Sequence, residues 1–223
     1  LNRALIKQGL KIFAKRKNIG LKTLYDNSKI LNAPNSYNLA YLIGPKINAG
    51  GRVGQSTFGA ELLISDNQEK VDYLANKLND FNEERKAIEK ELIQKIEKKI
   101  INKDNPVILI QGNDFHEGLI GIAAARIKEK YNKPCVIIST NGKVGRGSAR
   151  SVFGFDIGTF IIAAVQKGIL LKGGGHKYAA GLKIKNSKII EFSDFLEKNI
   201  NYDFSIDNHI NFYDSIISIE EIN

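Results

Sequence analysis

The segment Leu171–Gly181, with the sequence LKGGGHKYAAG, places three consecutive glycines directly before His176. Consecutive glycines are costly in a packed element, because each loses much conformational entropy on folding and offers no side chain to the core. Bare backbone has a different use: successive N–H groups can turn toward one point and bind an anion that side chains would keep away. His176 adds a donor that depends on pH, and Lys177 adds positive charge. The segment therefore predicts a glycine loop that approaches a phosphate.

Two further segments combine glycine with arginine. GRGSARS at 145–151 offers clearance at Gly147 and a guanidinium on Arg150 that can grip a phosphate through two parallel hydrogen bonds. NAGGRVG at 48–54 pairs two glycines with Arg52. One glycine-rich segment alone is more often only a turn, whereas three of them with Arg or His in one chain favour anion binding. None has the spacing of a nucleoside-triphosphate P-loop.

Positive charge is concentrated in two parts of the chain. The 223 residues carry a formal net charge of +9, and residues 1–60 contain ten Lys and Arg against a single acid, Asp26. Residues 139–181 form the second basic stretch, in which Asp156 is the one acidic residue. This distribution favours a polyanionic partner such as a nucleic acid, although a lysine-rich solvated surface would give the same total.

The order of the predicted elements indicates an α/β fold. Apolar residues at three- and four-residue steps predict helices over 2–17 and 66–102. Beyond Pro106, buried-strand patterns alternate with helix patterns, which predicts a mixed, largely parallel sheet flanked by helices. The strand patterns are 107–112, 134–140 and 178–185, and the helix patterns lie within 113–131, 157–168 and 188–200.

Two local expectations concern helix ends. Pro45 is expected to stop a helix from running through 44–54, so that NAGGRVG is a loop. Asp66, followed three residues later by Glu69, resembles a capping box at the start of the long charged helix.

The sequence lacks the ligands of a self-contained metal hydrolase. Hydrolysis of a phosphodiester usually takes two metal ions held by clustered carboxylates and histidines. The three histidines, His116, His176 and His209, are widely separated, and there is no D-x-D, H-x-H or H-E-x-x-H motif and no cysteine cluster. We therefore expect this chain to bind no metal by itself.

Four blocks of the chain, in the right order, resemble the DHH family of phosphoesterases. GGGHKYAAG is similar to the signature of the DHHA1 domain, the second lobe of that family, and FHEGLIGIAAARI and GRGSARS are similar to two further blocks of the lobe. GPKINAGGRVG, followed by GAELLIS and the long charged helix, resembles the RecJ branch, bacterial exonucleases that degrade single-stranded DNA from 5′ ends. The resemblance covers nearly the whole chain.

The resemblance implies a division of the chain. Residues 1–65 would be the C-terminal end of the DHH lobe, 66–105 a long connecting helix, and 106–200 the DHHA1 substrate-binding domain. Residues 201–223 resemble the start of a following β domain of the oligonucleotide-binding type, cut short. The D-H-H motif and the other metal ligands of the family lie upstream of Leu1. We therefore expect the chain to begin inside a longer protein, whose Mn²⁺ or Mg²⁺ is bound by the absent lobe.

The resemblance also implies roles for individual residues. His176 would be catalytic, stabilising or protonating a group near the scissile phosphate. His116 would contact DNA, with ordering of its own loop as the alternative. The residues expected to bind substrate are Arg52, His116, Ser148, Arg150, Ser151, Gly174 and Gly175.

Three functions are compatible with these observations. The first is the substrate-binding part of a 5′→3′ single-stranded-DNA exonuclease of DNA repair and recombination. The second is a DHH phosphodiesterase for short oligonucleotides or cyclic dinucleotides, and the third is a non-catalytic DNA-binding subunit. The excess of Lys and Arg over residues 1–60 favours the first, because it suits a long polyanion. Its expected partners are single-stranded DNA and single-strand-binding or replisome proteins, and the chain is expected to be a monomer.

The remaining composition favours a reducing cytoplasm. The single cysteine, Cys135, lies in an apolar strand pattern, is expected to be buried, and can form no internal disulfide. No apolar run approaches the length of a membrane span. Phe153, Phe155 and Tyr178 are candidates for stacking on bases, and each is equally compatible with a place in the core.

Overall fold

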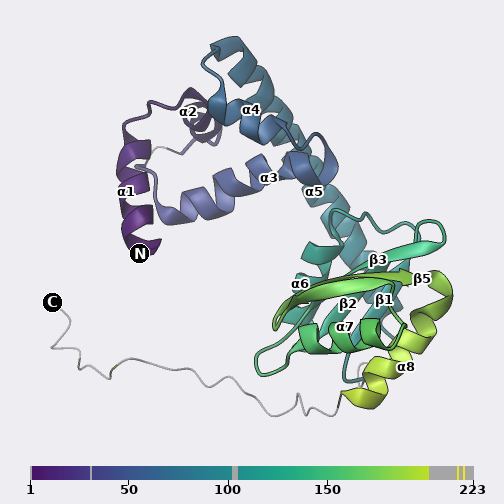
Figure 1. Cartoon of the computed structure of the whole chain (residues 1–223). Coiled ribbons are helices and arrows are strands. Elements are labelled where there is room, and N and C mark those ends of the chain that lie inside the picture. Colours follow the sequence, from purple (N-terminus) through teal and green to yellow (C-terminus); the bar gives the residue numbers. More distant parts are fainter. Residues whose placement is uncertain (1, 31, 102–104, 201–214, 216–217, 219–223) are drawn as a thin grey trace. The chain divides into compact units, whose positions relative to one another are not determined.

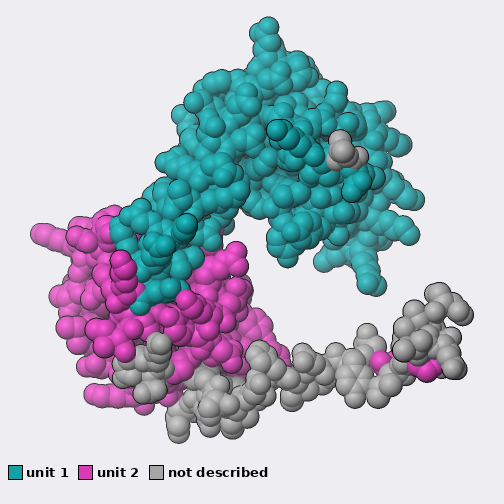
Figure 2. All heavy atoms as spheres, turned by 180° about the vertical axis from the view of Figure 1, so that it is seen from behind, with its two compact units in different colours: residues 1–97, 116–119 teal, residues 98–115, 120–223 magenta. Residues whose placement is uncertain are grey.

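The computed structural model describes residues 2–30, 32–101, 105–200, 215 and 218 (Figure 1). The chain divides into two compact units, shown in different colours in Figure 2: Leu1–Glu97 with His116–Leu119, and Lys98–Phe115 with Ile120–Asn223. In the part that the structure describes, the first unit is helical and the second is α/β. The β domain expected at 201–223 lies outside the described residues, apart from Ser215 and Ser218.

The first unit packs its helices around a small apolar core. Its elements are α1 (Asn2–Ala14), α2 (Ile19–Asp26), the π-helix η1 (Asn38–Ile43), α3 (Gly44–Val53), α4 (Phe58–Ile64) and nearly all of α5 (Gln68–Lys99). Helix α5 contributes apolar residues at three- and four-residue steps, as its amphipathic pattern predicts. The core consists of Phe13, Leu24, Tyr25, Ile43, Leu62, Val71, Leu74, Ala75 and Leu78.

The two long helices expected in this unit are present, with different details. Helix α5 starts after Asn67, whose side-chain Oδ1 accepts a hydrogen bond from the backbone N–H of Lys70 at 2.9 Å. The capping box expected from Asp66 and Glu69 is therefore wrong, and Asn67 caps the helix. Of the apolar residues that suggested an amphipathic α1, Phe13 is buried, whereas Leu5, Ile6 and Ile12 are exposed.

The expectation that Pro45 prevents a helix over 44–54 is also wrong. Pro45 stands in the first turn of α3, where proline has no intrahelical N–H to lose. Gly50 and Gly51 lie inside this helix rather than in a loop. A Cβ on Gly50 would lie 2.6 Å from the backbone oxygen of Gln55, so the tight return of the chain after α3 explains this glycine.

The second unit is built on a five-stranded sheet with the order β1-β2-β3-β5-β4. The strands are β1 (Ile108–Gly112), β2 (Cys135–Ser139), β3 (Val144–Arg150), β4 (Lys172–His176) and β5 (Ala179–Lys185). The α/β class and the flanking helices are confirmed. The sheet is not largely parallel, because β1 and β2 form the one parallel pair among the described strands. Short connections at 140–143 and 177–178 form hairpins, and a hairpin pairs its strands antiparallel.

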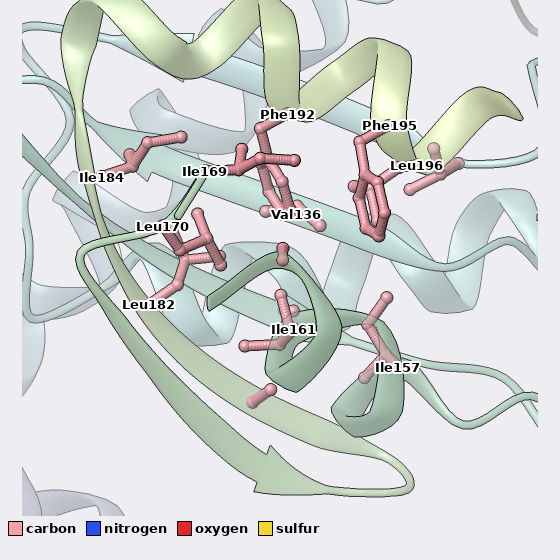
Figure 3. Close-up of a cluster of buried hydrophobic side chains, with 14 of the residues drawn as sticks. Val136, Ile157, Ile161, Ile169, Leu170, Leu182, Ile184, Phe192, Phe195 and Leu196 are labelled. Atoms are coloured by element: carbon pink, nitrogen blue, oxygen red, sulfur yellow. The ribbon is translucent and has the colours of Figure 1, made fainter. Parts of the chain in front are cut away.

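Helices pack on both faces of this sheet. Helix α6 (Ile120–Tyr131) packs on β2 and β3, whereas α7 (Ile157–Gln166) packs on β4 and β5 and α8 (Ile189–Asn199) follows the short helix η2 (Asn186–Lys188). The apolar side chains of α7, α8 and the inner face of the sheet form one core (Figure 3). Its labelled members are Val136, Ile157, Ile161, Ile169, Leu170, Leu182, Ile184, Phe192, Phe195 and Leu196.

Cys135 is buried in β2, as expected, with its side chain fully removed from solvent. Burial disfavours the charged thiolate and raises the pKa of the Cys135 thiol well above its ordinary value. The thiol therefore behaves as a small apolar group of the core and not as a nucleophile.

This burial predicts a pH dependence of stability. The free thiol of the unfolded chain ionises at about pH 8.5, while the native thiol stays protonated. Above that pH the unfolded state binds fewer protons, so the free energy of unfolding falls by up to about 1.4 kcal/mol per pH unit. We expect the stability difference between the unaltered chain and Cys135→Ala, measured by urea unfolding from about pH 7 to 10, to shrink above about pH 8.5. A difference that stays constant over this range would contradict the assignment.

Candidate functional site

One face of the sheet is uncovered over β4 and β5. A Cβ on Gly173 would lie 2.6 Å from Cγ2 of Ile161, so Gly173 faces α7. Because side chains alternate along a strand, Gly174 faces the opposite side. On β5, Leu182 lies in the core and Gly181 is exposed on the other side. A Cβ added at Gly174 or at Gly181 would meet no atom of the described chain within 4 Å.

Helix α6 covers only part of this side of the sheet. A Cβ on Gly121 of α6 would lie 3.2 Å from Ser148 Oγ and 3.2 Å from Arg150 Nη2. The helix therefore stops over β3, and the neighbouring strands β5 and β4 remain open. We call this surface the glycine face; it consists of Lys172, Gly174 and His176 of β4, Ala179, Gly181 and Lys183 of β5, and Arg146, Ser148 and Arg150 of β3.

The strand register arranges the glycine face in three rows across the strands. Directly paired residues of antiparallel strands share a face, and their Cβ atoms are about 5 Å apart. The central row has almost no side chains. On one side of it lies a row of three cations, and on the other side lies a row that contains a histidine and an arginine. The rows are Lys172–Lys183–Arg146, Gly174–Gly181–Ser148 and His176–Ala179–Arg150.

The expected glycine loop is instead the edge strand β4. Its glycines have no positive φ; the positive-φ glycines of the described chain are Gly142, Gly154 and Gly168. Successive N–H groups of an extended strand point to opposite sides, so the three glycines cannot converge on one anion. The prediction of a concave loop is therefore wrong. What the structure offers is a flat, bare strip beside the outer edge of β4, which no other described strand pairs.

The three glycines of β4 differ in what surrounds them. Gly173 allows the strand to lie directly on α7, and a Cβ on Gly175 would lie 2.3 Å from the backbone oxygen of Ala179. Packing within the fold therefore requires these two. Gly174 and Gly181 have open space above them, and glycine in a strand lowers stability. Nothing in the described fold lies close enough to explain these two glycines.

Arg150 and Ser148 are held together at the end of β3. Nη1 of Arg150 donates to Ser148 Oγ at 3.0 Å and to the backbone oxygen of Ala149 at 2.8 Å. Both side chains are half-buried, beside the first turn of α6. The guanidinium is thereby oriented along the strand, next to the central row Gly174–Gly181–Ser148, which we call the bare row.

Ser151, by contrast, is turned into the protein. It is 4% exposed, and its Oγ donates to the backbone oxygen of Phe155 at 2.8 Å. Its backbone N–H donates to the oxygen of Tyr178 at 3.0 Å. The structure therefore separates Ser151 from Ser148 and Arg150 and gives it a part in holding the loop after β3. Phe155 is buried as well, whereas Phe153 and Tyr178 are exposed.

His176 is exposed at the end of β4, and its hairpin is fixed by the segment before α7. The backbone oxygen of Lys177 accepts a hydrogen bond from Ile157 N–H at 3.2 Å. Asp156 caps α7 by accepting from the N–H of Thr159. A Cβ on Gly158 would lie 3.0 Å from the backbone oxygen of His176, so this glycine allows α7 to approach the strand.

Arg52 and His116 form a second group, within the first unit. Arg52 Nη1 donates to the backbone oxygen of Gly118 at 3.1 Å, and the N–H of Gly118 donates to Nδ1 of His116 at 3.2 Å. A Cβ on Gly118 would lie 2.4 Å from the backbone oxygen of Arg52, so only glycine fits there. His116 thus orders its own turn, which is the structural alternative considered for it. Because its Nδ1 accepts, neutral His116 carries its proton on Nε2.

The described residues provide no metal centre: no three His, Cys, Asp or Glu side chains among them gather closely enough to hold an ion. None of the described helices combines the length and the apolarity needed to cross a membrane.

The glycine face includes three residues for which the sequence analysis predicts no binding role, although two of them lie within LKGGGHKYAAG. Gly181, Lys183 and Lys172 become part of the site through strand pairing. The signal that could have found two of them is the alternation in AAGLKIK at 179–185, where Gly181 and Lys183 interrupt the apolar residues.

Comparisons with known proteins agree with this architecture. Residues 104–201 match the DHHA1 domain family. The single-stranded-DNA-specific exonuclease RecJ of Haemophilus influenzae is 31% identical over 210 residues, which cover 89% of this chain and 36% of that protein. Crystal structures of RecJ from Thermus thermophilus in complex with Mg²⁺ and with Mn²⁺ each match with a TM-score of 0.80 and 27% identity. The match covers 88% of this chain and 30% and 29% of those chains.

The chain spans about a third of the length of the curated relatives that it matches. Its likeness to them extends through both units, because the matched part includes the helical first unit as well as the sheet. Residues 104–201 are thus a DHHA1 domain, and over most of its length the chain is a relative of the RecJ exonucleases.

Proposed function

We propose that this chain forms the substrate-binding part of a 5′→3′ single-stranded-DNA exonuclease. The related RecJ proteins are named for action on single-stranded DNA. The observation that carries the proposal is the bare row of the glycine face, where Gly174 and Gly181 leave backbone open to solvent without a reason inside the described fold. A phosphodiester backbone is a ligand that benefits from such an approach, because it can lie close to the bare strand and its oxygens can reach N–H groups on the outer edge of β4, which no described strand pairs.

In this proposal a phosphate lies over the bare row, and the neighbouring groups bind it from both ends. Arg150 supplies a guanidinium whose direction is already set by its bonds to Ser148 Oγ and the oxygen of Ala149. His176 is exposed and lies in the same row as Arg150, at the opposite end. It would donate a hydrogen bond to a phosphate oxygen and stabilise charge there. Preorganised donors of this kind cost little rearrangement when substrate binds.

Residues of the first unit would bind further phosphates. Arg52 is exposed and anchored to Gly118, and this unit contains the basic residues 1–60. The structures of Thermus thermophilus RecJ contain Mg²⁺ or Mn²⁺. The described residues do not fit such an ion, so we propose that the divalent metal of the complete enzyme is bound by residues outside the described part of this chain.

The first test separates neighbouring glycines. Gly174→Ala should leave the thermal midpoint unchanged or raise it, because alanine loses less entropy than glycine by about 0.5–1 kcal/mol. It should weaken the binding of single-stranded DNA, since its methyl group stands where the phosphate approaches. Gly175→Ala is the matched control, because its Cβ would clash with the oxygen of Ala179 and should lower the midpoint. Thermal unfolding and fluorescence anisotropy with a labelled oligonucleotide measure both effects. Full DNA binding by Gly174→Ala would contradict the proposed approach.

The second test concerns Arg150 and the type of substrate. The chain should bind 5′-phosphorylated single-stranded DNA better than a duplex of equal length, with a log–log salt slope of about −0.7 per phosphate contacted. Arg150→Lys keeps the charge but loses the planar fork, and should weaken this binding about tenfold or more. Arg126→Lys, the same change at an exposed ion pair with Glu129, should have little effect.

Two results would count against the function. Equal affinity of Arg150→Lys and Arg126→Lys would remove Arg150 from the binding site. No salt-sensitive binding of single-stranded DNA by the folded, unaltered chain would remove the substrate-binding role itself. A cyclic dinucleotide that binds more tightly than the long single strand would instead favour a phosphodiesterase for small substrates.

A further inference from the structure

The cationic row of the glycine face lies outside the buried apolar core. Lys183 lies directly opposite Lys172 on one side and Arg146 on the other. Like charges placed directly opposite each other on neighbouring strands lower stability. All three side chains are exposed, and the buried apolar core contains none of them. The register therefore places three cationic side chains next to one another on an exposed face, where they can bind an anion.

The geometry of the sheet places this cationic row beside the bare row and parallel to it. Lys172 is two residues before Gly174, and Lys183 is two residues after Gly181 on the antiparallel strand. Two residues of a strand span about 7 Å, so the two rows are about 7 Å apart. An extended nucleic-acid strand that runs along β4 and β5 would therefore bring successive phosphates to successive rows.

We propose that Lys172, Lys183 and Arg146 form a second phosphate subsite, next to the phosphate over Gly174 and Gly181. This proposal rests on the proposed function and refines it. The second unit binds two consecutive phosphates of one strand, so that its ligand is a phosphodiester chain and not an isolated phosphate group. The strand lies along β4 and β5, with its phosphates toward the sheet and its bases directed away from it.

The direction of the strand follows from the ends of the rows. Helix α6 closes the β3 side of the face at Ser148 and Arg150, whereas β4 is an open edge of the described sheet. A strand parallel to β4 and β5 avoids α6 altogether, while one that crosses the sheet would run into it. The path along the hairpin therefore contacts both lysines.

The test compares single charge removals. Lys172→Gln and Lys183→Gln each remove one cation from the row, and Lys198→Gln removes one from the exposed surface of α8, which packs on the other face of the sheet. The double variant Lys172→Gln/Lys183→Gln should reduce the magnitude of the log–log salt slope for a single-stranded oligonucleotide by about 0.7, the contribution of one phosphate. Lys198→Gln should leave the slope unchanged.

A measurement of thermal stability separates a role of Lys183 in DNA binding from a role in the fold. Removal of the central charge in Lys183→Gln relieves two like-charge pairs, so the thermal midpoint should stay the same or rise. Lys183→Gln should thus bind DNA less tightly while being at least as stable as the unaltered chain. A lower midpoint would show that the lysine supports the fold and would overturn the subsite.

Neutral linkages identify which phosphate is bound. In a 5′-phosphorylated tetranucleotide, each internal phosphate is replaced in turn by a neutral methylphosphonate. At one position the methylphosphonate should weaken binding by the unaltered chain. In the variant Lys172→Gln/Lys183→Gln, the same replacement should not weaken binding further. If no position shows this loss of sensitivity while Gly174→Ala still weakens binding, the subsite is wrong and the proposed function stands. If Gly174→Ala and Arg150→Lys also bind normally, the proposed function falls as well.

Discussion

The close packing of β4 on α7 is the constraint on which the site depends. Gly173 has room for no side chain, because Cγ2 of Ile161 occupies the space where a Cβ would lie. Once this residue faces α7, the two-residue period of the strand places Gly174 on the opposite face with Lys172 and His176. A one-residue shift of β4 would turn Gly174 into the core and Gly173 to solvent. Such a shift would bring Lys172 or His176 into a position where Gly173 or Gly175 has no room for a Cβ.

The same sheet therefore has two different surfaces. Leu182 and Ile184 of β5 join α7 and α8 in an apolar core (Figure 3). Gly181 and Lys183 alternate with them along the strand and remain exposed. An antiparallel hairpin tolerates this, since one face of such a sheet can remain in water. Burial stabilises the hairpin from one side only, which leaves the composition of the other side free to serve binding.

The sequence predicted the elements better than their pairing. The long helix and the buried Cys135 depend on local periodicity, and the structure confirms them. The alternation of strands and helices is only partly right, because β3 and β4, which were not predicted as strands, form hairpins with β2 and β5. The glycine run was misread as a loop, because glycine disfavours strands and its partner Gly181 is identified only when the hairpin is paired. NAGGRVG was misread for a similar reason: Pro45 breaks a helix interior but suits a first turn, and the sequence does not say where the helix starts. Ser151 and Ser148 look equivalent in GRGSARS, yet the end of β3 buries one of them beside Phe155.

Open glycines and opposed lysines both reduce the stability of the hairpin, and they occur on the same face. Each feature alone has an ordinary explanation, because isolated glycines and surface lysines are common in strands and on surfaces. Their registration across β4, β5 and β3 is harder to explain separately: a row without side chains lies directly beside a row of cations. Both would be compensated by the same ligand, a chain of phosphates that touches backbone at one row and charge at the next. The coincidence of these two features on one face is therefore an argument for what the face binds.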